Sequence, residues 1–137
     1  MRQNRNYKIF ISGKITGDAD YKTKFACAKA DITNSYRWCK ENRSCLRDQC
    51  PFHDLSYIYT CRAYGMFDKQ IDVIKPTEFN LEGRPWLVCM FVCLRELRKC
   101  DAVFMLNDWK ESSGARWEHR YAKFLHKRII YQKEARR

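Results

Sequence analysis

Residues 101–131 read DAVFMLNDWKESSGARWEHRYAKFLHKRIIY, and this stretch decides the fold. Asp101–Leu106 is an apolar run with the length of a buried strand. The polar loop Asn107–Ser113 follows it, and apolar residues then recur at helical spacing over Gly114–His126. Ile129–Tyr131 is a second short apolar run. The order strand, helix, strand predicts two parallel strands joined by a right-handed crossover.

The same alternation extends toward the amino terminus. Lys8–Ser12 is an apolar run that stops at a glycine, and Tyr21–Lys40 has helical spacing. Ile71–Ile74 is another short apolar run, and Pro85–Lys99 predicts an apolar helix whose proline suits the first turn. The pattern predicts a single α/β domain over residues 1–137. We expect a small Rossmann-like (flavodoxin-like) three-layer fold with a parallel sheet of four to five strands.

The composition indicates a globular and strongly basic chain. Of the 137 residues, 45% are hydrophobic, which is enough for a core and argues against disorder. The formal net charge of +11 favours an anionic partner such as a nucleotide or a nucleic acid. The alternative is that the positive charge serves solubility and reflects a basic tail. Basic residues crowd the carboxyl-terminal end of the sequence: Lys127, Arg128, Lys133, Arg136 and Arg137.

The sequence shows no targeting signal. The basic segment Met1–Tyr7 is not followed by the long apolar region of a signal peptide, and no apolar run approaches the roughly 20 residues of a membrane span. We therefore expect a cytoplasmic protein without membrane contact. In that compartment the eight cysteines are reduced thiols, or some of them bind a metal.

An insertion at residues 41–67 interrupts the alternation of strands and helices and contains three cysteines and one histidine. Cys39, Cys45, Cys50 and His53 lie close in sequence and can supply four ligands for a structural zinc ion. The alternative is that these cysteines are small core residues. Apart from zinc, we expect no cofactor to be required.

Two loops leave the carboxyl ends of predicted strands, which is where ligands bind in sheets of this kind. The first loop, Ser12–Asp18, contains Gly13 and Gly17, whose backbone N–H groups can approach an anion closely. The alternative is an ordinary turn between a strand and a helix.

The second loop opens the last predicted helix. Ser112 or Ser113 can cap this helix, or can hold a phosphate at its amino end. Glu118 lies in one helical stripe with Gly114 and Ala122, so small neighbours leave room for a ligand beside its carboxylate. The alternative is that Glu118 points to solvent or pairs with a distant arginine.

Both loops resemble the signatures of the nucleoside 2-deoxyribosyltransferase superfamily. IFISGKITG (residues 9–17) resembles its opening strand and loop, and CDAVFML (100–106), followed by Trp109 and SSGARWE (112–118), resembles its other signature. The sequence is most similar to an uncharacterised bacterial and phage branch, a domain of unknown function. The resemblance covers the chain except residues 41–67.

The resemblance implies a reaction and assigns roles to residues. In the characterised relatives, which include 2'-deoxynucleoside 5'-phosphate N-hydrolases, a glutamate attacks the anomeric carbon and forms a glycosyl-enzyme ester. The resemblance gives this role to Glu118, and it gives the 5'-phosphate contact to Ser112. Including the other residues of the two loops, the ligand-binding residues that we expect are Ser12, Gly13, Lys14, Ile15, Gly17, Asp101, Trp109, Ser112, Ser113 and Gly114.

Three positions depart from the family pattern. The hydrolases carry an aspartate, which helps to protonate or orient the leaving base, where this chain has Cys93. A thiol donates a proton only weakly near neutral pH, so either Asp108 serves as the acid or catalysis has been lost. Asp108 stands where the bacterial and phage branch usually has glycine, and Lys14 stands where it usually has proline.

The prediction from sequence is therefore an enzyme that cleaves or transfers the N-glycosidic bond of a nucleotide or nucleoside. The first alternative is a phage-encoded protein that binds or sequesters a nucleotide without turnover. The second is a nucleic-acid-binding module that uses the basic charge and the insertion. Because relatives of this fold often form dimers or larger assemblies, we expect a homo-oligomer.

Overall fold

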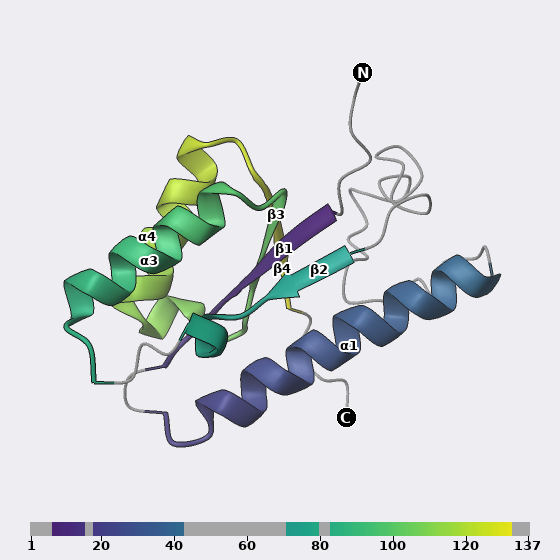
Figure 1. The fold of residues 1–137 in the computed structure, drawn as a ribbon, viewed down its shortest axis with the longest axis horizontal. Coiled ribbons are helices and arrows are strands. Elements are labelled where there is room, and N and C mark those ends of the chain that lie inside the picture. Colours follow the sequence, from purple (N-terminus) through teal and green to yellow (C-terminus); the bar gives the residue numbers. More distant parts are fainter. Residues whose placement is uncertain (1–6, 16–17, 43–70, 80–82, 133–137) are drawn as a thin grey trace.

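The computed structural model describes residues 7–15, 18–42, 71–79 and 83–132. Strands and helices alternate along this part of the chain (Figure 1). The elements in order are β1 (Tyr7–Ser12), α1 (Tyr21–Asn42), β2 (Ile71–Ile74), the 3-10 turn η4 (Pro76–Phe79), α3 (Trp86–Arg98), β3 (Ala102–Met105), the 3-10 turn η5 (Trp109–Glu111), α4 (Ser113–Phe124) and β4 (Arg128–Tyr131).

The described strands form one four-stranded parallel sheet in the order β2-β1-β3-β4. Ile9 of β1 pairs with Val73 of β2 on one side and with Ala102 of β3 on the other. Val103 of β3 pairs with Ile129 of β4. The chain first moves outward from β1 to β2 and then crosses back to β3, so the direction of winding reverses between β1 and β3. In open α/β sheets this reversal opens a crevice at the carboxyl ends of the two strands.

The helices cover both faces of the sheet and make the fold three-layered. Helix α1 lies on one face, and α3 and α4 lie on the other (Figure 1). Alternate side chains of β1 point to opposite faces, so Ile9 and Ile11 pack with Phe25 of α1, whereas Phe10 packs with Leu97 of α3. All residues of β3 are buried, as expected for a central parallel strand. The predicted fold class and strand number are confirmed.

Some predictions concern residues that the structure does not describe. Gly17, Cys45, Cys50 and His53 lie outside the described residues, and so does the side chain of Cys39, whose backbone belongs to α1. The zinc site in the insertion therefore stays a prediction. Within the described ranges, no group of three or more histidine, cysteine or acidic side chains could hold a metal ion. In the same ranges, no helix is both long enough and apolar enough to span a membrane.

Candidate active site

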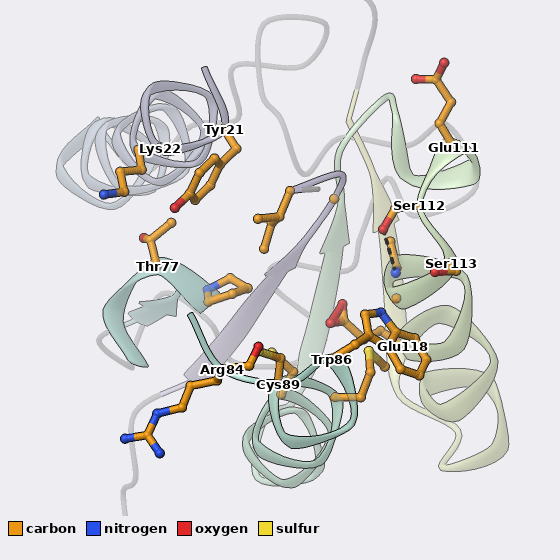
Figure 2. Close-up of a pocket in the computed structure, with 17 residues that line it drawn as sticks. Tyr21, Lys22, Thr77, Arg84, Trp86, Cys89, Glu111, Ser112, Ser113 and Glu118 are labelled. Atoms are coloured by element: carbon orange, nitrogen blue, oxygen red, sulfur yellow. Dashed lines mark hydrogen bonds between the residues drawn. The ribbon is translucent and has the colours of Figure 1, made fainter. Parts of the chain in front are cut away.

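A pocket of about 750 Å³ opens at the carboxyl edge of the sheet, where the winding reverses. Glu118 lies between its two walls, with Ser112 and Ser113 on one side and Lys22, Thr77 and Arg84 on the other (Figure 2). The described lining residues are Gly13, Ile15, Tyr21, Lys22, Pro76, Thr77, Arg84, Trp86, Cys89, Met90, Cys93, Glu111, Ser112, Ser113, Gly114, Ala115 and Glu118.

Glu118 is the buried carboxylate of this pocket. Its side chain comes from the second turn of α4 and is only 5% exposed. The hydroxyl of Ser12, the fully buried last residue of β1, donates a hydrogen bond to Glu118 Oε2. The alternative that Glu118 points to solvent is wrong, and among the described residues it pairs with no arginine.

Burial makes Glu118 harder to ionise than an ordinary glutamate. Removal from water raises the pKa of Glu118 to about 7, and the hydrogen bond from Ser12 opposes this rise by stabilising the carboxylate. The group can therefore exist in either protonation state near neutral pH. A carboxyl group with such a pKa can serve as a nucleophile when it is ionised and as a proton donor when it is protonated.

The amino end of α4 forms one wall of the pocket. Ser112 caps the helix, because its Oγ accepts a hydrogen bond of 3.2 Å from the N–H of Ala115. The helix begins at Ser113, one residue before the predicted start. Free N–H groups of the first turn and the helix dipole make this wall favourable for an anion. Ser112, Ser113 and Gly114 all line the pocket, as expected for ligand-binding residues.

Two glycines allow close packing around the pocket. A Cβ atom at Gly13 would lie 2.6 Å from Leu106 Cδ1, so a larger residue does not fit there. A Cβ atom at Gly114 would lie 3.1 Å from Met90 Sδ, so the absence of a side chain lets α4 approach α3. The expected reason for Gly13 was access of its N–H to an anion. The structure adds a further reason, which is the clash that a side chain here would make with Leu106.

The sequence matches a family described as a domain of unknown function (DUF4406) over residues 63–131. The chain belongs to this family. The fold is similar to that of a solved structure described as 2-desoxiribosyltransferase from Leishmania mexicana, with a TM-score of 0.53 and 15% sequence identity. The match covers 91% of this chain and 63% of the other, so the chain spans less than two thirds of that structure. No curated protein matches the sequence.

Several residues that were expected to bind the ligand do not line the pocket in this DUF4406 protein. Asp101 lies at the opposite edge of the sheet, where its Oδ2 accepts a hydrogen bond of 2.9 Å from the N–H of Lys8. Trp109 stacks on His119, with 4.2 Å between the ring centroids. Lys14 contacts the rest of the protein through its backbone, and its side chain is not part of the pocket wall. Of the neighbouring loop residues, Gly13 and Ile15 do line it.

Asp108, the expected acid, is placed in an ion pair. One oxygen of its carboxylate contacts Lys24 Nζ, and the other accepts a hydrogen bond of 3.0 Å from the N–H of Lys14. The residue is not part of the pocket wall. These contacts favour a role in holding the two loops together over the role of an acid.

One wall of the pocket was missed by the sequence analysis. Trp86, Cys89, Met90 and Cys93 of α3 line the pocket, whereas the sequence pattern predicts only an apolar helix here. The segment after β2, which contains Thr77, also lines the pocket. The sequence did contain a sign of this wall. Because β2 was predicted as a strand of the same parallel sheet, its carboxyl end had to lie at the same edge of the sheet as the carboxyl ends of β1 and β3.

Cys93 lines the same pocket as Glu118 and is a neutral group. Its side chain is buried and lines the pocket with Glu118. Burial, and then the charge of Glu118, raise the pKa of the Cys93 thiol far above its usual range. The thiol therefore stays protonated and holds its proton too tightly to act as an acid near neutral pH.

Proposed function

We propose that this protein cleaves or transfers the N-glycosidic bond of a nucleotide or nucleoside, with Glu118 as the nucleophile. The observation that carries the proposal is the buried Glu118 carboxylate, which accepts a hydrogen bond from Ser12 inside a pocket at the carboxyl edge of the sheet. The fold shared with a protein described as a deoxyribosyltransferase supports the same substrate class.

The reaction consists of two displacements at the anomeric carbon. An oxygen of ionised Glu118 forms a bond to this carbon while the bond to the base nitrogen breaks, and the electron pair leaves with the base. Water, or a second base, then attacks the same carbon and releases the Glu118 carboxylate. Ser12 fixes the orientation of the carboxylate through its hydrogen bond.

We propose that the preferred substrate is a nucleotide that carries a 5'-phosphate. The amino end of α4 favours an anion, and the hydroxyls of Ser112 and Ser113 lie at this end of the pocket. A phosphate bound there would place the attached sugar within the same pocket as Glu118. Arg84 and Lys22 add positive charge to the opposite wall.

One observation favours binding without turnover as the second candidate. Cys93 occupies the place of the residue that assists the leaving base in the related hydrolases, and its thiol stays protonated in this environment. A protein with this pocket that lacks an effective acid would bind and sequester the nucleotide. The two candidates differ in whether free base appears.

The test is an incubation of the purified protein with ribo- and deoxyribonucleosides and their 5'-monophosphates, followed by chromatography of the released bases. We expect release of a base from at least one 5'-monophosphate, and loss of this release in Glu118→Gln. Glu96→Gln is the matched control, because Glu96 is a partly exposed glutamate of α3 that pairs with Lys99 and is not part of the pocket wall. Binding of a nucleotide without release of base by the wild type would support the second candidate instead.

We also propose that the protein forms a homo-oligomer through α3. Large apolar side chains are exposed on this helix, with Leu87 at 75% and Phe91 at 67% exposure. Trp86 and Val88 are exposed on the same helix, and Trp117 is exposed on neighbouring α4. Exposed apolar residues that cluster in this way mark contact sites between proteins.

A further inference from the structure

We infer that Lys24 and Asp108 are positioning residues whose ion pair joins the loop after β1 to the loop after β3 and thereby fixes the backbone that lines the pocket. The contacts themselves are independent of any reaction. The expected effect on turnover rests on the proposed function.

Lys24 is surrounded by acceptors from both loops. From the first turns of α1, its Nζ donates hydrogen bonds to Lys14 O at 2.8 Å and to Asp18 Oδ2 at 2.6 Å, and it also contacts Asp108 Oδ2. An ammonium group has three N–H donors, and here three acceptors are present. Two of these acceptors belong to the loop after β1, and the third belongs to the loop after β3. A single side chain therefore links the two loops.

Asp108 extends the link to the backbone of residue 14. Its Oδ1 accepts a hydrogen bond of 3.0 Å from the N–H of Lys14, while the carbonyl of Lys14 accepts from Lys24. Both backbone polar groups of Lys14 are thus held by the ion pair. Its two neighbours, Gly13 and Ile15, line the pocket. Loss of either partner would therefore free the part of the loop that lines the pocket.

The ion pair is partly shielded from water, and its environment favours the charged form of Lys24. The side chains of Lys24, Asp18 and Asp108 are 23%, 25% and 20% exposed. Burial by itself lowers the pKa of Lys24, but hydrogen bonds to Asp108 and Asp18 outweigh it and the pKa is raised overall. A partly shielded ion pair that makes a further hydrogen bond stabilises the contact between two segments more than a fully exposed ion pair does.

The pair also accounts for two departures from the pattern that the sequence resembles. Proline, the usual residue at position 14, has a fixed φ angle and no N–H. Here Lys14 supplies an N–H, and Asp108, in place of the usual glycine, supplies its acceptor. A hydrogen bond thus restrains the loop at position 14. The two departures therefore supply the donor and the acceptor of one hydrogen bond.

The first measurement is amide hydrogen exchange in the ligand-free protein, with NMR as the detection method. In Asp108→Asn and in Lys24→Met we expect the Lys14 amide to exchange about tenfold faster or more, because a hydrogen bond to a charged acceptor is weakened or lost. The amides of Ile9 and Val103 should keep their protection, because the sheet is unchanged. Lys29→Met on the same helix is the control for loss of a lysine. Unchanged exchange of Lys14 in both variants would overturn the inference.

The second measurement is the kinetics of base release for a substrate found in the nucleotide panel. We expect KM to rise about tenfold in Lys24→Met and in Asp108→Asn with a smaller change in kcat, and Lys24→Arg to retain most of the wild-type KM. The double variant should add little to either single variant, because both remove one unit. If the wild type releases no base, the proposed function fails while the exchange experiment still decides the inference. If the effects of the two substitutions on KM were fully additive in free energy, Lys24 and Asp108 would not act as one link between the loops.

Discussion

At the scale of single residues, Glu118 determines how the proposed reaction depends on pH. Because burial raises its pKa to about 7, most of the carboxyl groups are protonated at pH 6 and cannot attack a sugar. We expect kcat/KM to rise with pH up to about 7 and then to level off. In Ser12→Ala the hydrogen bond that lowers the pKa is lost, so the rise should move to higher pH. A profile in the variant that rises at lower pH would contradict this assignment.

The same shift has a consequence for stability. The folded-state pKa of Glu118 lies above its ordinary value of 4.5, so ionisation opposes folding and stability is lost as pH rises from about 4.5 to about 7. This loss is the cost of burying the Glu118 carboxyl group in the pocket. Functional carboxyl groups are often found under such conditions.

In the proposed reaction, we expect the residue at position 93 to affect which bases can leave. In Cys93→Asp the new carboxyl is buried beside Glu118, so its pKa is raised and it can donate a proton near neutral pH. We expect release of guanine from a guanine nucleotide to increase about a hundredfold, the lower end of the effect of a general acid. Release of N7-methylguanine should change little, because this base leaves without needing a proton. Cys93→Ser is the size-matched control, and an equal gain for both bases would exclude a role in proton transfer.

At the scale of elements, the two glycines of the pocket respond differently to an added methyl group. Gly13→Ala places a Cβ atom 2.6 Å from buried Leu106, and we expect a loss of about 1–3 kcal/mol in the free energy of unfolding. In Gly114→Ala the tightest contact, at 3.1 Å, is with Sδ of the flexible Met90 side chain, and Ser112 Oγ and Trp86 Nε1 lie at 3.8 and 3.9 Å. Alanine also favours the helix, by up to about 1 kcal/mol. The stability of this variant should therefore be close to that of the wild type. Urea unfolding of both variants checks that Gly13→Ala is less stable than Gly114→Ala, and equal losses in the free energy of unfolding would contradict this prediction.

The elements were predicted well because local sequence determines them. Apolar runs such as Ile9–Ile11 place the strands, and Ser112 marks the start of α4 through its capping hydroxyl. The pocket was predicted only in part, because side-chain placement depends on partners far apart in the chain. Asp108 and Lys24 are 84 residues apart, and no local pattern connects them. The face of α3 that lines the pocket has the same spacing as a face that lies in the core, so periodicity could not distinguish the two.

At the scale of the whole molecule, the exposed apolar residues of α3 predict assembly. We expect the wild type to be a dimer or larger by light scattering coupled to size-exclusion chromatography. The double substitution Leu87→Glu and Phe91→Glu should give monomers, because charges replace two side chains that are largely exposed in the single chain. Arg95→Glu, which changes the charge on the same helix, is the control. A monomeric wild type would show that α3 serves another purpose.

The placement of Glu118 also restricts the stereochemistry of the proposed reaction. Ser12 and the end of β1 close off the space behind the carboxylate, so a sugar can approach it from the open side of the pocket alone. The first displacement inverts the anomeric centre, and the incoming acceptor must then enter by the path that the base has left. The second inversion restores the original β configuration. With methanol as the acceptor, the product should be the β-methyl glycoside by NMR, whereas an α product would mean that water or methanol attacks directly and that Glu118 forms no ester.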